Sequence, residues 1–194
     1  MSKTIKLYEN SSYISKFNAT VTDCIKVEED DRFHGIYTYK AVLDKTAFYP
    51  EGGGQPSDRG SITLIHRSAS THNPALKNIT VSAVNETNGI IYHYISAPFS
   101  AGDSVECKID WDFRFMLMQH HTGEHIVSGL INRHFGFNNV GFHMGENYVT
   151  VDIDGKLTQE DLDFIEISAN NTVQKNLGVK LDCPVPAKLD VLTY

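Results

Sequence analysis

The stretch VECKIDWDFRFMLMQHHTGEHIVSGLINRH, residues 105–134, contains the change of pattern that decides the fold. Residues 105–109 are the last of several short candidate strands in the first part of the chain. From Trp111 the spacing of apolar residues becomes helical, and no proline interrupts it as far as His134. We expect Asp112 to cap this helix. The sequence therefore predicts a β-rich domain over residues 1–110 and an α+β domain over residues 111–194.

Upstream of this stretch, the chain has the pattern of a small all-β domain. Candidate strands fall at residues 17–21, 36–43, 61–65, 79–84 and 90–95. The polar residues between the third and fourth of these strands are expected to form a loop. Short strands at this spacing, with no long helical pattern among them, indicate a small barrel or sandwich.

Downstream of the helix, strand and helix patterns are mixed. Asparagine and glycine within residues 138–141 indicate a turn, and residues 148–153 then alternate as a strand. The sequence TQED at residues 158–161 is typical of the capped start of a second helix, for which Gly178 is a natural C-terminal stop. Residues 179–183 are the last candidate strand.

Composition excludes several classes of protein. The chain has 194 residues, with 17 basic and 24 acidic side chains, so its net charge is 17 − 24 = −7. This charge balance argues against a protein that coats a long duplex such as DNA, because such binding requires clustered basic side chains. It permits binding to the short end of a nucleic acid. No apolar run approaches the ~18 residues of a membrane span. Without a secretory signal and with an odd number of cysteines, we expect a cytoplasmic protein without a disulfide framework.

The predicted first helix carries ionisable residues where its apolar stripe should be. His120 and Glu124 fall inside the stripe, and His121 and His125 lie beside it. His121 and His125 are four residues apart, so both imidazoles project from one face, as two ligands of a Zn²⁺ ion require. The alternative is one histidine hydrogen-bonded in the core and one solvated. Glu124 or His120 is a candidate base or a support for the ligands, and Glu124 is equally consistent with a surface charge.

The same residues also spell H-x-x-E-H, the inverted zinc-peptidase signature. Such a peptidase needs a third protein ligand and a large substrate chamber. Only 194 − 125 = 69 residues follow His125, and the preceding half of the chain is a small β domain. The peptidase interpretation therefore fits poorly.

A glycine-rich segment, FYPEGGGQPSDRG at residues 48–60, lies between two candidate strands. Its glycines Gly52, Gly53 and Gly54 permit positive φ and close approach of another backbone or a ligand. No G-K-[S/T] follows and no helix begins there, so the segment is not a nucleotide-phosphate loop. Taken alone, it is more typical of a flexible hairpin tip than of a binding site.

The segment at residues 48–60, followed by RFMLMQHHTGEH at residues 114–125, resembles the alanyl-tRNA editing family, which comprises the free-standing AlaX proteins and the editing domain of alanyl-tRNA synthetase. The resemblance covers most of the chain. It implies an α+β fold, with a small N-terminal β-barrel of translation-factor type and a C-terminal editing domain in which two long helices pack on an antiparallel sheet. It also implies hydrolysis of mischarged tRNA(Ala), chiefly Ser-tRNA(Ala) and Gly-tRNA(Ala).

The resemblance also assigns roles to particular residues. The family's first zinc motif falls on His121 and His125, and its substrate-facing strand falls near residues 139–143. Its glycine motif falls on Gly52, Gly53, Gly54 and Gln55. The second zinc motif, Cys-x-x-x-His, has no counterpart here, because Cys24, Cys107 and Cys183 are followed four residues later by Glu28, Trp111 and Ala187. The second domain is therefore expected to be incomplete at its C-terminus, with two zinc ligands not identifiable.

The implied reaction is attack of water on the ester that joins an amino acid to the tRNA 3′ end. Backbone amides of the glycine turn are candidate donors to the developing oxyanion. A pocket that separates serine from alanine needs a group that hydrogen-bonds a hydroxyl. Asn139, His143 and Thr150 are the candidates for it.

The expected partner is the acceptor end of tRNA(Ala), which needs only a few phosphate contacts and base stacking. The basic residues Lys40, Lys45, Arg114 and Arg133 are candidates for these contacts, although solvated surface charge explains each of them as well. Two other functions stay open: the editing module of threonyl-tRNA synthetase, which lacks the glycine-rich barrel, and a non-catalytic tRNA-binding fragment.

Overall fold

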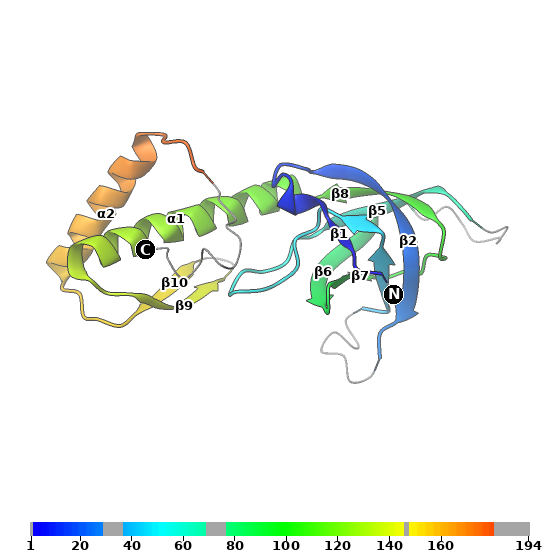
Figure 1. Cartoon of the computed structure of the whole chain (residues 1–194), viewed down its shortest axis with the longest axis horizontal. Helices are drawn as coiled ribbons and strands as arrows, with labels where there is room; N and C mark the ends of the chain where they lie inside the picture. Colours follow the sequence, from blue (N-terminus) through cyan, green and yellow to red (C-terminus); the bar gives the residue numbers. More distant parts are fainter. Residues whose placement is uncertain (1, 29–36, 69–76, 146–147, 181–194) are drawn as a thin grey trace.

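Six antiparallel strands close into a barrel at one end of the molecule, and a long helix leads away from it (Figure 1). The computed structural model describes residues 2–28, 37–68, 77–145 and 148–180. The barrel strands are β2 (Lys16–Lys26), β3 (Tyr39–Leu43), β5 (Gly60–His66), β6 (Ile79–Thr87), β7 (Ile90–Ile95) and β8 (Ser104–Ile109). They follow one another as β2-β3-β7-β6-β5-β8, and β8 pairs with β2 to complete the circle. Of the two expected all-β architectures, the barrel is confirmed.

Alternation along the strands builds the barrel core. In β8, Val105, Cys107 and Ile109 are buried while their neighbours are more exposed, as period-two side-chain geometry requires. The tight connection between β6 and β7 uses Asn88 and Gly89, both at positive φ, which suits a two-residue hairpin. A short parallel pair, β1 (Ile5–Lys6) and β4 (Lys45–Thr46), lies outside the barrel sheet, with a 3-10 turn, η1 (Leu7–Glu9), after β1.

The long helix α1 (Trp111–Phe135) begins two residues after the last barrel strand. Its N-cap is Asp110, whose carboxylate accepts a hydrogen bond from the backbone N–H of Phe113, so the expectation of Asp112 as cap was wrong. Asp112 lies in the first turn instead, where a negative charge still favours the helix dipole. The apolar stripe expected on this helix consists of Phe113, Leu117, Val127 and Ile131, and of these Leu117 and Ile131 are buried.

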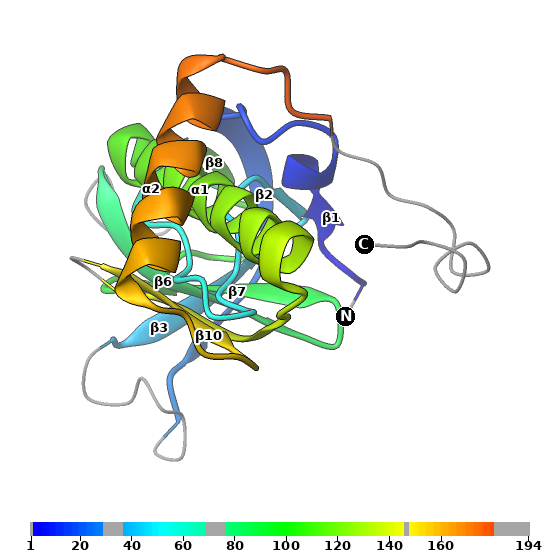
Figure 2. The ribbon, with the colours of Figure 1, turned by 90° about the vertical axis from the view of Figure 1, so that its left-hand side faces the viewer.

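Beyond α1, a two-stranded antiparallel sheet and a second helix complete the described fold. Strand β9 (Asn139–Met144) pairs with β10 (Val149–Ile153), and α2 (Gln159–Gln174) packs across α1 (Figure 2). The turn expected within residues 138–141 was wrong, because residues 139–141 lie in β9. The strand that the resemblance placed near residues 139–143 is confirmed. Gly141 pairs with Asp152, whose side-chain Oδ2 would lie 2.6 Å from an added Cβ.

Helix α2 begins as expected and ends earlier than expected. Thr158 and Asp161 form a reciprocal capping box, which confirms the predicted start. The helix ends at Gln174, and Asn176, at positive φ, occupies the position expected for Gly178. Val179 and Lys180 are not in a strand, and the rest of the expected strand lies outside the described residues, as does most of the expected loop after β5. Neither described helix is long and apolar enough to span a bilayer.

Candidate functional site

The glycine-rich segment leaves the barrel between β4 and β5 and extends along α1 to β9 (cyan in Figure 1). Its tip is a tight turn in which the backbones of Gly52 and Gln55 exchange two hydrogen bonds, at 3.0 and 3.2 Å. Gly54 has φ +80, and a Cβ there would lie 2.1 Å from the carbonyl oxygen of Phe142. Its own carbonyl accepts a hydrogen bond from Met144 N at 2.9 Å. The turn is therefore docked on β9 through a contact that only glycine permits, unlike a flexible hairpin tip.

A buried ion pair fixes the base of this segment to α1. Arg114 donates from Nε to Asp58 Oδ1 at 2.7 Å and from Nη2 to Asp58 Oδ2, and it also donates to the carbonyl of Ala47 at 2.7 Å. Asp58 in turn accepts from Tyr49 N at 2.6 Å. The side chain of Arg114 is only 5% exposed, so both roles expected for it, phosphate contact and solvated charge, were wrong. It joins the helix to the glycine-rich segment.

The two histidines expected to bind metal lie together on α1. The rings of His121 and His125 are stacked, with centroids 4.9 Å apart and planes inclined by 25°. His121 Nδ1 lies 2.6 Å from Oε1 of Gln55, so the ring nitrogen donates and the amide oxygen accepts. The structure therefore brings the glycine-rich turn and the histidine pair into direct contact, across 66 residues of sequence.

Electrostatics keep His121 neutral. Burial lowers its pKa, and the neighbouring His125 lowers it further, against the opposite effect of Glu124. With Nδ1 carrying the proton toward Gln55, Nε2 holds the free lone pair. A neutral imidazole with its second nitrogen hydrogen-bonded is the form in which histidine binds metals.

Glu124 lies beside this pair in a small polar network. Its side chain is 4% exposed, and Oε1 accepts hydrogen bonds from Ser128 Oγ and from Asn139 Nδ2, the latter at 2.7 Å. Oε2 lies 3.5 Å from His125 Nδ1. The buried carboxylate is thus held by donors from α1 and β9 and faces a histidine, so it is not a surface charge.

The other predicted site residues are less connected. His120 Nδ1 is buried and has no hydrogen-bond partner within the described part of the chain. His143 pairs with Thr150 across the β9–β10 sheet and is exposed. Strand alternation puts it on the face opposite Phe142, whose ring centroid is 5.7 Å from that of His121. The structure does not bring His143 and Thr150 to the histidine pair.

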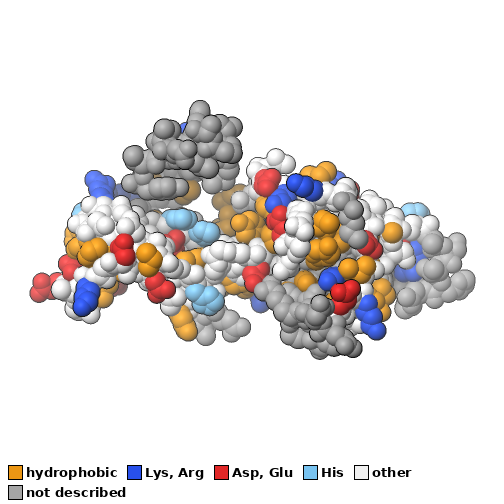
Figure 3. Space-filling view, turned by 60° about the horizontal axis from the view of Figure 1, so that its bottom comes forward, with side chains coloured by type: hydrophobic (Ala, Val, Ile, Leu, Met, Phe, Trp, Pro, Cys, Tyr) orange, Lys and Arg blue, Asp and Glu red, His pale blue; other side chains and the backbone are white. Residues whose placement is uncertain are grey.

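Sequence reasoning missed Ser128, although its i, i+4 spacing from Glu124 on one helix was a usable signal. It also missed the roles of Phe142, whose ring lies beside His121, and of Asp58 and Arg114, which form a buried ion pair. No local pattern signals the long-range contacts of Phe142 or of Asp58. Figure 3 shows histidine side chains on the narrow part of the molecule between the barrel and the α2 end, and basic side chains scattered among acidic ones elsewhere on that face.

The residues present suit two of the four ligands of a zinc ion. His121 and His125 offer neighbouring ring nitrogens: Nδ1 of His121 is hydrogen-bonded to Gln55, and Nδ1 of His125 lies 3.5 Å from Glu124 Oε2. Over the described ranges, no group of three or more histidine, cysteine or acidic side chains could hold a metal ion. Cys183 lies outside those ranges.

Similarity to known proteins identifies the family of the chain. The family model of class II (A) tRNA synthetases matches residues 2–113. The alanyl-tRNA editing protein AlaX-L of Pyrococcus horikoshii is 28% identical over 91% of this chain and 40% of its own length. The alanyl-tRNA editing protein Aarsd1 of Rattus norvegicus is 29% identical over 90% of this chain and 40% of its own. The alanine–tRNA ligase of Natronomonas pharaonis is 36% identical over 94% of this chain and 18% of its own.

The chain belongs to the alanyl-tRNA editing family. It spans about two-fifths of the length of the family's editing proteins that it matches, and less than a fifth of the ligase. Because each alignment covers at least nine-tenths of this chain, the likeness to the family extends past the barrel into α1 and its histidines.

Proposed function

We propose that this chain hydrolyses the ester of mischarged tRNA(Ala), chiefly Ser-tRNA(Ala) and Gly-tRNA(Ala), at a site that includes zinc. One observation carries the proposal: the hydrogen bond between Gln55 and His121, which unites the glycine-rich turn with the histidine pair. The relatives named as alanyl-tRNA editing proteins support the substrate class. The acidic net charge is compatible, because an acceptor end needs few phosphate contacts.

The histidine pair would hold the metal through the two Nε2 atoms. Zinc supplies Lewis acidity, which polarises a carbonyl or lowers the pKa of a bound water. Gln55 holds the proton of His121 on Nδ1 and so keeps Nε2 available. Glu124 has Oε1 occupied by two donors and Oε2 directed at His125 Nδ1, so we assign it the corresponding positioning role for His125.

The glycine turn supplies candidate donors to the ester. Gly52 N and Gln55 N are used within the turn, whereas the N–H groups of Gly53 and Gly54 have no hydrogen-bond partner among the described residues. Such amides next to the histidine pair suit the oxygen that becomes negative as water attacks the carbonyl. Asn139, already bonded to Glu124 through Nδ2, keeps the site polar on the β9 side, where a serine hydroxyl of the substrate needs a partner.

The test combines metal content with deacylation. Purified protein is assayed for zinc per chain and for release of serine, glycine and alanine from tRNA(Ala). We expect bound zinc and faster release of serine and glycine than of alanine. His121→Ala and His125→Ala should each lower both zinc content and rate by more than about 100-fold. His66→Ala, on the exposed end of β5, is the matched control and should change neither.

Other outcomes would favour the alternatives. Binding of tRNA(Ala) without zinc or turnover would indicate a non-catalytic RNA-binding module. This alternative is favoured by one observation: over the described ranges, no group of three or more histidine, cysteine or acidic side chains could hold a metal ion. Cleavage of peptides with no effect on aminoacyl-tRNA would indicate the H-x-x-E-H peptidase.

A further inference from the structure

One flank of α1 carries a regularly spaced row of side chains. Six residues recur at alternating intervals of four and three, and we call them the α1 seam: Trp111, Phe115, Met118, Thr122, His125 and Gly129. At ~100° per residue, the six positions fall within an arc of about 80°. Alternating intervals of four and three residues are the spacing with which one helix packs along another.

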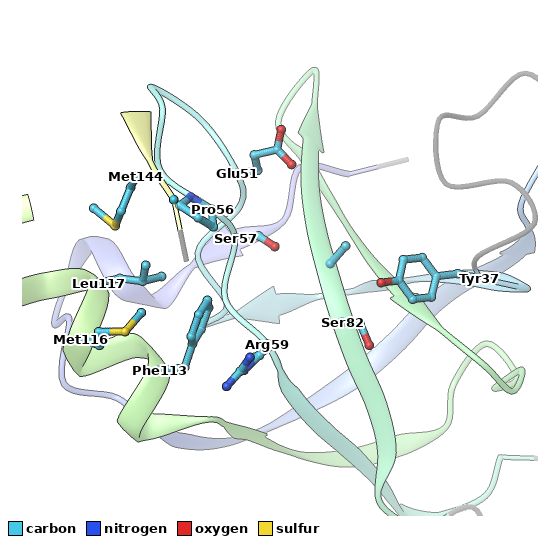
Figure 4. A pocket seen from close by; sticks show the side chains of 12 residues that line it. Tyr37, Glu51, Pro56, Ser57, Arg59, Ser82, Phe113, Met116, Leu117 and Met144 are labelled. Atoms are coloured by element: carbon cyan, nitrogen blue, oxygen red, sulfur yellow. The ribbon is translucent and has the colours of Figure 1, made fainter. Parts of the chain in front are cut away.

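The seam faces away from the part of α1 that packs on the rest of the protein. Phe113, Met116 and Leu117 line a cleft together with Pro56 of the glycine-rich segment (Figure 4). These three helix positions lie about 140–240° around the axis from the start of the seam. On the seam, the side chain of Phe115 is 41% exposed, and positions 122, 125 and 129 are exposed as well. The seam is therefore an accessible helix face.

The histidine pair lies in the middle of this face. His125 is a seam residue whose side chain is 71% exposed, and His121 is one turn before it, with its ring stacked on that of His125. The pair offers two of the four ligands that zinc prefers. Over the described ranges, no larger group of metal-binding side chains is present. A second α1 that crosses at this point would bring a second pair, and so the remaining two ligands.

Charges at the two ends of α1 specify how a second copy would lie. Asp112 and Arg133 are both exposed, and neither forms an ion pair within the described part of the chain. The midpoint of the histidine pair is position 123, so Asp112 lies 123 − 112 = 11 residues before it and Arg133 lies 133 − 123 = 10 residues after it. In an antiparallel pair centred there, Asp112 of each copy faces Arg133 of the other. A parallel pair would set like charges together at both ends.

The shapes of the facing residues also fit this register. Met118 lies 123 − 118 = 5 residues before the midpoint, and Gly129 lies 129 − 123 = 6 residues after it. Nothing lies within 4 Å of a Cβ built on Gly129, so the flexible thioether of Met118 from a second copy has space there. The antiparallel sense also places each barrel beside the α2 end of the other copy, because the barrel and α2 lie at opposite ends of α1 (Figure 1).

We propose that two copies of this chain pair antiparallel along the α1 seam, with both histidine pairs on one zinc ion at the two-fold axis. Such a contact is isologous, so every interaction occurs twice. Each copy has a net charge of −7, and the copies repel each other unless a cation lies between them. Pairing should therefore depend on zinc. The inference rests on the zinc site of the proposed function and adds the partner that completes it.

Molar mass and metal content provide the first test. Light scattering measures the mass of chelator-treated protein before and after zinc is added, and zinc is then counted per chain. We expect a monomer without zinc, and with zinc a dimer that holds one ion per two chains. His125→Ala should stay monomeric in both conditions. A monomer with one zinc per chain, or a dimer that is unchanged by zinc removal, overturns the proposal.

Charge exchange tests the antiparallel register. Asp112→Arg and Arg133→Asp should each weaken zinc-dependent dimerisation about tenfold, because each sets like charges together at both ends of the contact. The double variant, Asp112→Arg with Arg133→Asp, should dimerise as the unchanged protein does. Its recovery also shows that the single variants are folded. A double variant that dimerises no better than the single ones overturns the proposal.

An apolar residue of the seam supplies an independent variant. Phe115→Asp buries a charge in the contact and should weaken dimerisation at least about 30-fold. Ile65→Asp, at a 55% exposed position of β5, is the matched control and should dimerise normally. Equal dimerisation of the two variants overturns the proposal.

Failure of this inference is distinct from failure of the proposed function. If a chain that stays monomeric with zinc releases serine from tRNA(Ala), the pairing is wrong and the activity stands. If zinc pairs the chains but no amino acid is released, the pairing stands and the deacylase proposal falls.

Discussion

Buried histidines of the barrel and of the α1–β9 region differ in whether their ring nitrogens have hydrogen-bond partners. In the barrel, His93 is fully buried with both ring nitrogens paired, Nδ1 to Ala41 O at 3.1 Å and Nε2 to Thr46 Oγ1 at 2.8 Å. On α1, by contrast, His120 Nδ1 is buried without a partner in the described structure. Glu124 nearby is a buried carboxylate. A fully satisfied polar group serves stability, whereas unpaired or charged groups in a helix stripe indicate a site whose partner is a ligand.

The largest expected effect comes from breaking the contact that joins the two regions. Arg114→Met leaves Asp58 buried without its partner, which should lower the free energy of unfolding by about 3–5 kcal/mol. Urea unfolding followed by circular dichroism measures it. Arg133→Met, at an exposed position of the same helix, should change the stability by less than about 0.5 kcal/mol. Similar losses in both variants would show that the buried pair is not the connection we infer.

Acid should destabilise the barrel through His93. Burial lowers the pKa of His93 to about 4, against an opposing hydrogen bond to Ala41, while the unfolded chain has a pKa of about 6.5. Between these values the unfolded state binds a proton that the folded state does not. Stability should therefore fall as pH drops from about 6.5 to 4, by about 3 kcal/mol from this residue alone, and then level off.

The measurement is the free energy of unfolding across that pH range in the unchanged protein and in His93→Gln. The variant lacks the titrating group, so its curve should be flatter, even though its stability at pH 7 is lower. Two parallel curves would mean that the pKa of His93 is not depressed in the folded barrel.

Alanine substitutions at two adjacent glycines of the turn should differ in their effect on deacylation. Gly53 and Gly54 both have positive φ, and each alanine substitution should cost about 1 kcal/mol for that reason. Only at Gly54 would the new Cβ collide with Phe142, whereas nothing lies within 4 Å of a Cβ at Gly53. Gly54→Ala should therefore displace the turn and abolish deacylation, and Gly53→Ala should keep most of it. Comparable activity of the two variants would contradict the docking of the turn on β9.

The mildest substitution removes the hydrogen bond between His121 of the helix and Gln55 of the turn. Gln55→Leu should lower zinc affinity and deacylation rate by about 10–100-fold, the usual cost of losing a group that orients a metal-binding histidine. Gln119→Leu, exposed on α1, is the matched control. Neither variant should alter the unfolding curve of the barrel, because both side chains lie outside its core.

Local chemistry made much of the fold predictable. The six barrel strands followed from alternation and strand composition, α1 from its helical period and the start of α2 from its capping box. The secondary-structure predictions were wrong where a residue type is typical of two different local structures. Asn139 and Gly141 belong to turns in general, but here they start a strand, where Asn139 bonds Glu124 and Gly141 fits against Asp152. The cap of α1 moved from one aspartate to another two residues away, a choice that the sequence leaves nearly balanced.

The sequence by itself determined which residues carry the chemistry: a histidine pair one helical turn apart, an acid beside it and a run of three glycines. Those features depend on spacing within a few residues, where backbone geometry is fixed. Only the tertiary structure decided that Gln55 meets His121, that Gly54 lies against Phe142 and that Arg114 is buried on Asp58. These contacts join segments many residues apart, and they form because closing the barrel sets where the glycine-rich segment and α1 leave it.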